Sequence, residues 1–338
     1  MTPRDSRPRS RRSCRPSAAL VALLVFAPAT ACTRQTPGPA PEPARGVPEA
    51  RAELVFQTVR IDAGGRAREF LLRVPAGAPS PMPLVVSLHG AGGHAAGVEK
   101  QSGWAALADR EGVALAYPDG IGKTWNDGRA DTPSLSVKEN VEDVAFLTAL
   151  IEDVATRAPI DRKRVYMNGI SNGAFMTSRF ACERGTMVAA IGLVAGTIGP
   201  YVLASCKPAR SVSVIAFSGT ADPIVPYEGG FVRLGVVVRG KAVSFEDNTR
   251  LWAGLAACAT PPERSTLPNI EADDGSTARL EAFACPNGAA VHAYTVLSGG
   301  HTWPGGQQYL PRLIIGPVNR DLDATKAMWA FFAAHPAP

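Results

Sequence analysis

The stretch Gly169-Ile170-Ser171-Asn172-Gly173 has the pattern of a sharp turn from a strand into a helix, with a serine at the turn. Residues 164–168 predict a short buried strand before it, and residues 174–181 carry apolar side chains at helical spacing after it. Such a turn strains the backbone of the serine and exposes its hydroxyl group, which suits a nucleophile. The pattern alone is a weak signal in a chain with 33 glycines, so its context decides the interpretation.

Strands and helices alternate along most of the chain. An antiparallel hairpin is predicted first, over 53–61 and 68–74, because a glycine-containing turn separates two strand-like runs. The strand at 84–88 is almost continuously apolar, as expected when helices cover both faces of a sheet. Further strands are predicted at 113–117, 164–168, 188–194, 211–217, 280–284 and 291–297, and helices at 104–110, 141–157, 174–181 and 324–333. This order predicts an α/β fold with a mostly parallel central sheet and helices on both faces.

A serine nucleophile needs a base to take its proton and an acid to orient that base. His301 follows Ser298-Gly299-Gly300 directly after a predicted strand, at the carboxyl end of the sheet, where reactive groups gather. His292 falls inside the alternating pattern of that strand, and His335 lies among proline and alanine near the end of the chain. We therefore predict Ser171 as the nucleophile and His301 as its base.

The acid is predicted to be Asp222, which gives the order serine, aspartate, histidine that is typical of such sites. It follows the predicted strand 211–217 by the short turn Ser218-Gly219-Thr220-Ala221. The competing interpretation is a turn residue before proline, a common use of aspartate. Asp273 and Asp274 are weaker candidates because they lie in a polar Gly-Ser stretch without a preceding core strand.

Acyl transfer also needs N–H groups that stabilise the negative oxygen of the intermediate. The backbone N–H of Asn172, directly after the nucleophile, is one candidate, and Ala91 in the loop His89-Gly90-Ala91-Gly92-Gly93 is the second. We expect the His89 ring to hold that loop together. The loop does not have the pattern of a phosphate site, because neither a following Lys-Ser/Thr pair nor G-x-G-x-x-G occurs there.

Residues 1–31 predict an export signal: an arginine-rich start, an apolar run at 18–29 that is too short to span a bilayer, and Ala29-Thr30-Ala31. They hold six arginines and one acid, so the formal net charge of +5 belongs to this segment and the rest is close to neutral. Nucleic-acid binding therefore has no electrostatic support. Two processing routes stay open, cleavage near Ala31 or lipidation at Cys32, which would anchor the protein to the bacterial envelope.

Residues 32–52 are rich in proline and alanine and predict a linker, which leaves 53–338 as one catalytic domain. That domain holds four cysteines, an even number that indicates two disulfides in an exported protein. Three connectivities are open, and the local pairs Cys182–Cys206 and Cys258–Cys285 are favoured. The paired C-x-x-C spacing of a zinc site does not occur, so we expect no metal, and serine chemistry implies no organic cofactor.

Several stretches together resemble the secreted polyhydroxybutyrate depolymerase and feruloyl esterase family of α/β-hydrolases. They are Leu88-His89-Gly90-Ala91-Gly92-Gly93, Tyr117-Pro118-Asp119-Gly120, Trp125-Asn126, Val141-Glu142-Asp143-Val144, the serine turn, Gly219-Thr220-Ala221-Asp222 and Gly299-Gly300-His301-Thr302-Trp303-Pro304-Gly305-Gly306. The last stretch is the most specific. The resemblance implies the α/β-hydrolase fold, with Ser171 as nucleophile, Asp222 as acid and His301 as base, and it agrees with the two disulfides.

The resemblance also implies a secreted serine esterase that works through an acyl-enzyme. Its substrate classes would be hydroxybutyrate oligomers or polyester, or feruloyl and acetyl sugar esters. We expect Trp303 and Trp125 to line the cleft, because flat aromatic rings pack well against acyl chains, phenolic rings and sugars; the alternative is that both are core residues. Residues 227–241 depart from the family and are expected to reshape the entrance to the site.

Two other functions stay open at this point. One is an acyltransferase or peptidase with the same triad, and the other is non-catalytic binding of carbohydrate or lipid on a hydrolase fold. The sequence indicates neither a polymer-binding module nor a protein partner, which favours soluble esters or oligomers over solid polymer.

Overall fold

The computed structural model describes residues 56–338, which fall within one compact unit. The predicted export signal at 1–31, the lipidation residue Cys32 and the linker at 32–52 lie outside the described residues. Across residues 56–338, no helix combines the length and the apolar character needed to cross a membrane.

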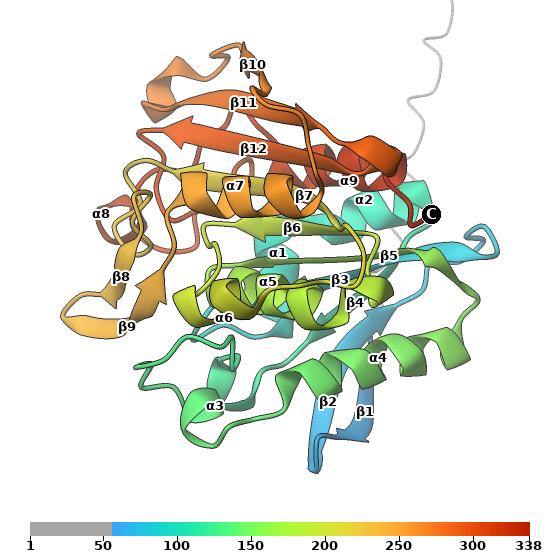
Figure 1. Ribbon diagram of the computed structural model, residues 1–338. Coiled ribbons are helices and arrows are strands. Elements are labelled where there is room, and N and C mark those ends of the chain that lie inside the picture. Colours follow the sequence, from blue (N-terminus) through green and yellow to red (C-terminus); the bar gives the residue numbers. More distant parts are fainter. Residues whose placement is uncertain (1–55) are drawn as a thin grey trace, which may run out of the picture. The chain divides into compact units, whose positions relative to one another are not determined.

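A ten-stranded sheet runs through this unit in the order β1-β2-β4-β3-β5-β6-β7-β12-β11-β10 (Figure 1). The strands from β4 to β12 in that order pair in parallel, and antiparallel strands extend the sheet at both edges. The strands are β1 (Gln57–Ala63), β2 (Arg66–Arg73), β3 (Met82–Leu88), β4 (Ala114–Pro118), β5 (Ile160–Ile170), β6 (Ala190–Val194), β7 (Ser213–Gly219), β10 (Glu263–Thr266), β11 (Thr277–Ala284) and β12 (Ala290–Leu297).

Helices cover both faces of the sheet, as the alternating order predicts. On one face lie α4 (Asp143–Arg157), α5 (Asn172–Arg184) and α7 (Phe245–Leu255), and on the other α1 (Ala95–Ser102), α2 (Trp104–Glu111) and α9 (Ala324–Ala334). Shorter helices are α3 (Leu135–Lys138), α6 (Pro200–Ser205) and α8 (Arg312–Ile315), with 3-10 turns at Ile121–Lys123, Gly185–Met187, Ala272–Asp274 and Pro286–Gly288.

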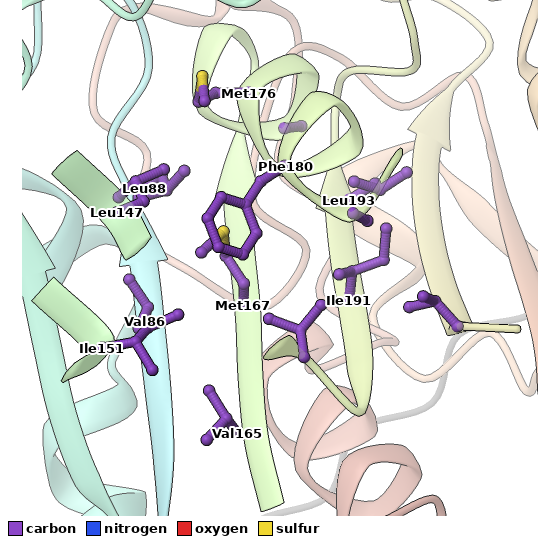
Figure 2. Packing of buried hydrophobic residues seen from close by; sticks show 14 of the residues in the cluster. Val86, Leu88, Leu147, Ile151, Val165, Met167, Met176, Phe180, Ile191 and Leu193 are labelled. Carbon is purple, nitrogen blue, oxygen red and sulfur yellow. The ribbon is translucent and has the colours of Figure 1, made fainter. Parts of the chain in front are cut away.

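The central strands are apolar throughout because they separate two cores. In β3, the side chains of Leu84 and Val86 join the core under α4 and α5, whereas Val85 joins the core under α1, α2 and α9. Figure 2 shows the first of these cores, where Leu147 of α4 and Phe180 of α5 lie over β3, β5 and β6. Each such side chain, when fully buried, contributes roughly 1.5–3 kcal/mol of transfer free energy, so the core fixes how α5 sits on the sheet.

The structure contains every strand and helix that the sequence predicts, with ends that differ by a few residues. The predicted hairpin is the antiparallel pair β1 and β2, and the two late strands are β11 and β12 near one edge of the sheet. Helix α7 was missed, although its start carries a signal: the Ser244 hydroxyl accepts a hydrogen bond from the Asp247 N–H at 3.0 Å. Shorter helices were missed because one or two turns give little periodicity.

Residues 227–241, which are expected to reshape the entrance to the site, form most of a second, two-stranded sheet. It pairs β8 (Gly230–Leu234) with β9 (Val237–Ala242) in antiparallel register. Neither strand pairs with a strand of the ten-stranded sheet. Val236, in the turn between the two strands, is 94% exposed. This hairpin supplies part of the candidate site described below.

Both favoured disulfides are present in the structure. Cys182–Cys206 ties the end of α5 to the segment after α6, and Cys258–Cys285 ties the segment after α7 to the end of β11. The first bond is therefore close in sequence to the helix that follows the serine turn.

Replacing Cys182 and Cys206 together with Ala is expected to lower the free energy of unfolding by about 3 kcal/mol, because a cross-link between residues 24 apart restricts the unfolded chain. Denaturant unfolding measures the loss. The double replacement of Cys258 and Cys285, which are 27 apart, is the matched control and should lose a similar amount. An unchanged unfolding midpoint in the first variant would contradict the expectation.

His292 offers a test of pH-dependent stability. It lies in β12 against the ring of Phe331, with ring centroids 4.8 Å apart, and near His335. Burial, with a smaller effect of His335, lowers the pKa of His292 from 6.5 to about 4. Because the folded protein binds this proton less tightly than the unfolded chain, the stability contribution is complete above pH 6.5 and is lost as the pH falls towards 4.

The variant His292→Gln should therefore lose less unfolding free energy than the wild type when the pH is lowered from 6.5 to 4. Urea unfolding at a series of pH values measures the two slopes. The exposed His94 is the matched control, and His94→Gln should keep the wild-type slope. Equal slopes for His292→Gln and the wild type would show that the prediction is wrong.

Candidate active site

Ser171 occupies the strained turn that the sequence predicts. It joins the end of β5 to the start of α5 with φ 55° and ψ −122°. A non-glycine residue with this backbone costs roughly 1–3 kcal/mol and persists only where its surroundings hold it. Two residues on, a Cβ at Gly173 would lie 2.5 Å from the carbonyl oxygen of Leu88 and 2.6 Å from that of His89. Glycine is therefore required for α5 to start so close to the end of β3.

Ser171 lines an open cavity of about 360 Å³ at the carboxyl ends of the parallel strands. The same cavity is lined by the loop 89–93, by His301 and by residues of the β8–β9 hairpin. The remaining lining residues are His94, Gly97, Val98, Gln101, Arg129, Ile170, Asn172, Ile224, Tyr309 and Leu310. The expectation that residues 227–241 shape the site agrees with this, since Val232, Leu234 and Arg239 all face the cavity.

His301 and Asp222 form a buried pair beside this cavity. The distance from His301 Nδ1 to Asp222 Oδ2 is 2.7 Å, and the side chains are 3% and 0% exposed. Because a carboxylate only accepts hydrogen bonds, Nδ1 carries the proton and Nε2 is left as an acceptor. The other Asp222 oxygen accepts the backbone N–H groups of Ile224 at 2.8 Å and Val225 at 2.9 Å, so the carboxylate is held in one orientation.

Tyr309 supports the same histidine from the cavity side. Its hydroxyl donates to the His301 carbonyl oxygen at 3.0 Å, and the His301 N–H donates to the Ile315 carbonyl at 2.6 Å. Burial first, and then the charge of Asp222, raise the pKa of Tyr309, so its hydroxyl keeps its proton. The sequence analysis missed Tyr309, which lies eight residues after the histidine without a recognisable motif.

The loop 89–93 lies against the serine turn and is held by His89. Its Nδ1–H donates to the Gly90 carbonyl at 2.8 Å, and its Nε2 accepts the Gly120 N–H at 3.0 Å. Burial lowers the pKa of His89, which keeps this ring neutral in both bonds. The structural role predicted for His89 is therefore the one that the structure shows.

Two backbone N–H groups that line the cavity, one at the serine turn and one in the loop 89–93, make no hydrogen bond with the described residues. Asn172 is the first residue of α5, so its N–H has no acceptor within the helix. The Ala91 N–H makes no hydrogen bond with any residue that the structure describes. Both residues line the cavity with Ser171, as expected for the pair of donors predicted from the sequence.

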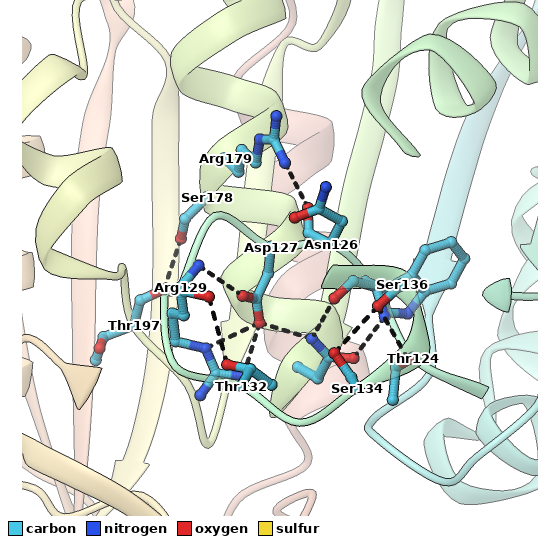
Figure 3. Close-up of polar contacts among 12 residues, drawn as sticks. Thr124, Asn126, Asp127, Arg129, Thr132, Ser134, Ser136, Ser178, Arg179 and Thr197 are labelled. Atoms are coloured by element: carbon cyan, nitrogen blue, oxygen red, sulfur yellow. Dashed lines mark hydrogen bonds and ion pairs between the residues drawn. The ribbon is translucent and has the colours of Figure 1, made fainter. Parts of the chain in front are cut away.

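The Asn172 side chain connects the serine turn to the segment 125–129. Its Oδ1 accepts the Trp125 N–H at 2.8 Å, and its Nδ2 donates to the Trp125 carbonyl at 3.1 Å and to Asp127 Oδ2 at 2.6 Å. The same Asp127 oxygen pairs with the Arg129 guanidinium at 2.7 Å (Figure 3). The start of α5 is thus fixed by side-chain bonds as well as by the strand before it.

The two tryptophans do not line the cleft, so that expectation is wrong. Trp125 and Trp303 are both 0% exposed, and neither lines the cavity. The Trp125 indole N–H donates to the His89 carbonyl at 2.9 Å, and the Trp303 indole N–H donates to the Thr325 hydroxyl at 3.0 Å. Their polar edges are satisfied inside the protein, which is the core alternative named from the sequence. Through its contacts with His89, the buried Trp125 holds the loop 89–93 from the core side.

Within residues 56–338, no group of three or more His, Cys, Asp or Glu side chains is arranged to hold a metal ion. The arrangement of a hydroxyl, an imidazole paired with a carboxylate, and two N–H groups around one cavity has the elements needed for acyl transfer.

This chain is similar to known esterases. The family model described as "Esterase PHB depolymerase" matches residues 69–227. A protein named "Putative esterase NocK" from Nocardia uniformis subsp. tsuyamanensis is 30% identical over 326 residues, which cover 89% of this chain and 94% of that protein. Feruloyl esterase B from Piromyces equi is 29% identical over 246 residues, which cover 69% of this chain and 42% of that protein. Poly(3-hydroxyalkanoate) depolymerase C from Paucimonas lemoignei is 33% identical over 143 residues, which cover 39% of this chain and 31% of that protein.

Among solved structures, the acetyl xylan esterase from Aspergillus awamori matches with a TM-score of 0.57 at 14% sequence identity, covering 83% of this chain and 99% of that one. This likeness shows the fold, which is that of the α/β-hydrolases. The family model matches residues 69–227, and the Nocardia relative is similar over most of this chain. The chain therefore belongs to the esterase PHB depolymerase family and is a carboxylic ester hydrolase. The family predicted from the sequence is confirmed. The chain spans less than half of the feruloyl esterase and of the depolymerase.

The buried Trp125 gives a test of this description. Trp125→Phe removes the donor to the His89 carbonyl, and an unpaired buried acceptor costs about 1–3 kcal/mol of unfolding free energy. We expect that loss and a lower kcat with little change in KM, because the Ala91 N–H in the loop 89–93 shifts while the apolar residues of the opposite wall stay in place. Trp329→Phe is the matched control, since Trp329 is partly buried and packs against the Tyr166 ring. A raised KM with unchanged stability would instead indicate contact with the substrate.

Proposed function

We propose that this protein is an extracytoplasmic serine esterase in which Ser171 attacks the ester carbonyl, His301 is the base and Asp222 orients it. The observation that carries the proposal is the buried His301–Asp222 pair, 2.7 Å apart, on the cavity that Ser171 lines. With Nδ1–H bound to the carboxylate, Nε2 is the nitrogen that can accept the serine proton. The backbone strain at Ser171 supports the same role, since it directs the hydroxyl into the cavity.

The reaction has two halves. In the first, the Ser171 proton passes to His301 Nε2 as the oxygen adds to the ester carbonyl, and His301 then protonates the departing alcohol as the carbon–oxygen bond breaks. In the second, His301 takes a proton from water, the hydroxide adds to the acyl-enzyme, and the acid leaves as Ser171 recovers its proton. The Asn172 and Ala91 N–H groups stabilise the negative oxygen in both halves.

The proposal also covers location and substrate. The arginine-rich, apolar segment at 1–31 supports export, and two disulfides support an oxidising compartment. Cys32 supports a lipid anchor in the bacterial envelope as one of the two processing routes. Relatives named as feruloyl esterases and as a poly(3-hydroxyalkanoate) depolymerase support hydroxy-acid oligomers and feruloyl or acetyl sugar esters as substrate classes.

Ser171→Ala is expected to lower kcat for p-nitrophenyl butyrate by about 10⁴-fold or more, with the unfolding midpoint unchanged or raised, since the strained residue loses only its hydroxyl. The absorbance of the released p-nitrophenolate measures the loss. Ser205→Ala, at the exposed last residue of α6, is the matched control and should keep full activity.

Labelling by a fluorophosphonate probe supplies a second measurement. The wild type and Ser205→Ala should form a covalent adduct at Ser171, and Ser171→Ala should form none. Wild-type turnover by Ser171→Ala, or a folded wild type that neither hydrolyses esters nor reacts with the probe, would overturn the proposal; the second result would favour non-catalytic ligand binding.

A further inference from the structure

Within residues 56–338, the cavity beside Ser171 is lined by arginines but by no acidic side chain. Among the described residues that line it, two are arginines, Arg129 and Arg239, and none is an aspartate or glutamate. Two carboxylates described above are already bound by other side chains. Asp127 is bound by Arg129 and Asn172, and Asp222 is bound by His301. Of the two arginines, Arg129 is therefore paired with Asp127, whereas Arg239 has no such partner among the described residues.

Arg129 is built into the cavity wall. Its side chain is 4% exposed, its Nε and Nη2 donate to Asp127 Oδ2 at 2.9 and 2.7 Å, and its guanidinium lies 3.9 Å from the centroid of the Phe175 ring. Figure 3 shows Arg129 facing Asp127 in this way. The third nitrogen, Nη1, is buried and makes no hydrogen bond with any described residue. A buried N–H group without a partner is costly unless a ligand or water accepts from it.

Arg239 of β9 has no counter-charge in the described part of the chain. It is half-buried and lines the cavity, and its Nε is buried without a hydrogen-bond partner. No carboxylate among residues 56–338 lies within ion-pair distance of it, whereas the exposed arginines Arg60, Arg162 and Arg250 all have such partners. A guanidinium that is partly removed from water and unpaired is the group that an anionic ligand would satisfy.

The backbone of β9 lies close to the segment that carries Arg129. Gly240, next to Arg239, has φ +78°, and a Cβ there would lie 2.8 Å from the Ala130 carbonyl oxygen and 3.1 Å from Arg129 Cβ. Only glycine permits β9 to approach the segment 129–130 this closely. This approach joins the hairpin of β8 and β9 to the segment 129–130, and Arg129 and Arg239 line the same cavity.

We propose that the cavity takes esters that carry a free carboxylate, and that Arg239, with the unpartnered Arg129 Nη1 in the same cavity, binds this carboxylate while Ser171 attacks the ester. The planar guanidinium matches the two oxygens of a carboxylate better than an ammonium does. Apolar residues, among them Ile224, Val232 and Leu310, line the same cavity and suit the carbon chain between the two groups. The substrate class is therefore half-esters of dicarboxylic acids or hydroxy-acid oligomers with a free acid end. This inference rests on the proposed ester hydrolysis at Ser171.

The test compares two ester series of equal length. Ethyl half-esters of succinic, glutaric and adipic acid carry a carboxylate, and the matching ethyl keto-esters carry a neutral acetyl group in its place. The measured quantity is the ratio of kcat/KM for the half-ester to kcat/KM for the keto-ester of the same length. The wild type should give a ratio above one for at least one length, and this ratio should fall as NaCl is added, because salt screens a partly exposed charge.

Arg239→Gln should lower that ratio by about ten- to hundredfold, the range expected for lost hydrogen bonds to a charged group. Arg239→Lys keeps the charge without the planar fork and should give an intermediate ratio. Arg233→Gln is the matched control: Arg233 lies in β8 of the same hairpin, is exposed, and does not line the cavity, so the ratio should stay as in the wild type. Calorimetric binding of glutarate half-ester to Ser171→Ala should be lost when Arg239→Gln is added.

Three outcomes overturn the inference. Wild-type ratios of one or below at every length show that the cavity does not prefer a carboxylate, while ester hydrolysis still stands. An equal loss of kcat/KM for both series in Arg239→Gln shows that the charge acts on the reacting ester or on packing instead. Failure of the wild type to hydrolyse either series or to react with a fluorophosphonate overturns the proposed function, and this inference with it.

Discussion

The turn at Ser171 is the constraint on which the rest of the site depends. Its backbone is held at φ 55° and ψ −122°, which no local preference of serine favours. The strain is offset by the packing of the two elements that the turn joins. Strand β5 is buried between β3 and β6, and the apolar face of α5 packs into one of the two cores. The hydroxyl is therefore presented between a strand and a helix that are both buried in the fold.

The loops around the turn are positioned by buried polar contacts that come from distant elements. Arg68 of β2 and Asp143 of α4 form an ion pair at 2.8 Å with side chains 1% and 0% exposed, and Asp143 also accepts the Asn126 N–H at 2.7 Å. In the segment 125–127, Asn126 is thus bound to Asp143, and Trp125 and Asp127 on either side of it are bound to Asn172. Loss of either partner of such a pair leaves a buried charge, which is far more costly than the pair itself contributes.

The cavity combines a wall that holds the proposed catalytic residues with a wall contributed by the β8–β9 hairpin. Ser171, His301 and the loop 89–93 come from the ends of central strands, where the fold leaves little freedom. Arg239 comes from a small separate sheet, whose Val232 and Ala242 pack with Phe175 of α5 in a core cluster of their own.

Much of the fold and of the catalytic wall could be predicted from the sequence because their signals are local. The strand before Ser171, the helix after it, and the positions of Asp222 and His301 just past strand ends can each be identified within about ten residues. The disulfide pairs were favoured for the same reason, since each closes a short stretch of chain.

Burial and partners were decided only by the tertiary structure. In the sequence, Trp125 and Trp303 cannot be told from tryptophans that line a cleft. Only the structure shows that they are core residues, with Trp125 bound to His89, 36 residues away, and Trp303 bound to Thr325, 22 residues away. Arg129 and Arg239 look like ordinary surface charges, and only the fold shows that both line the cavity. The sequence by itself thus determined the kind of chemistry expected and the order of its residues, because strand ends and turns are local. The folded chain alone decided which side chains line the cavity, because that depends on what packs against them.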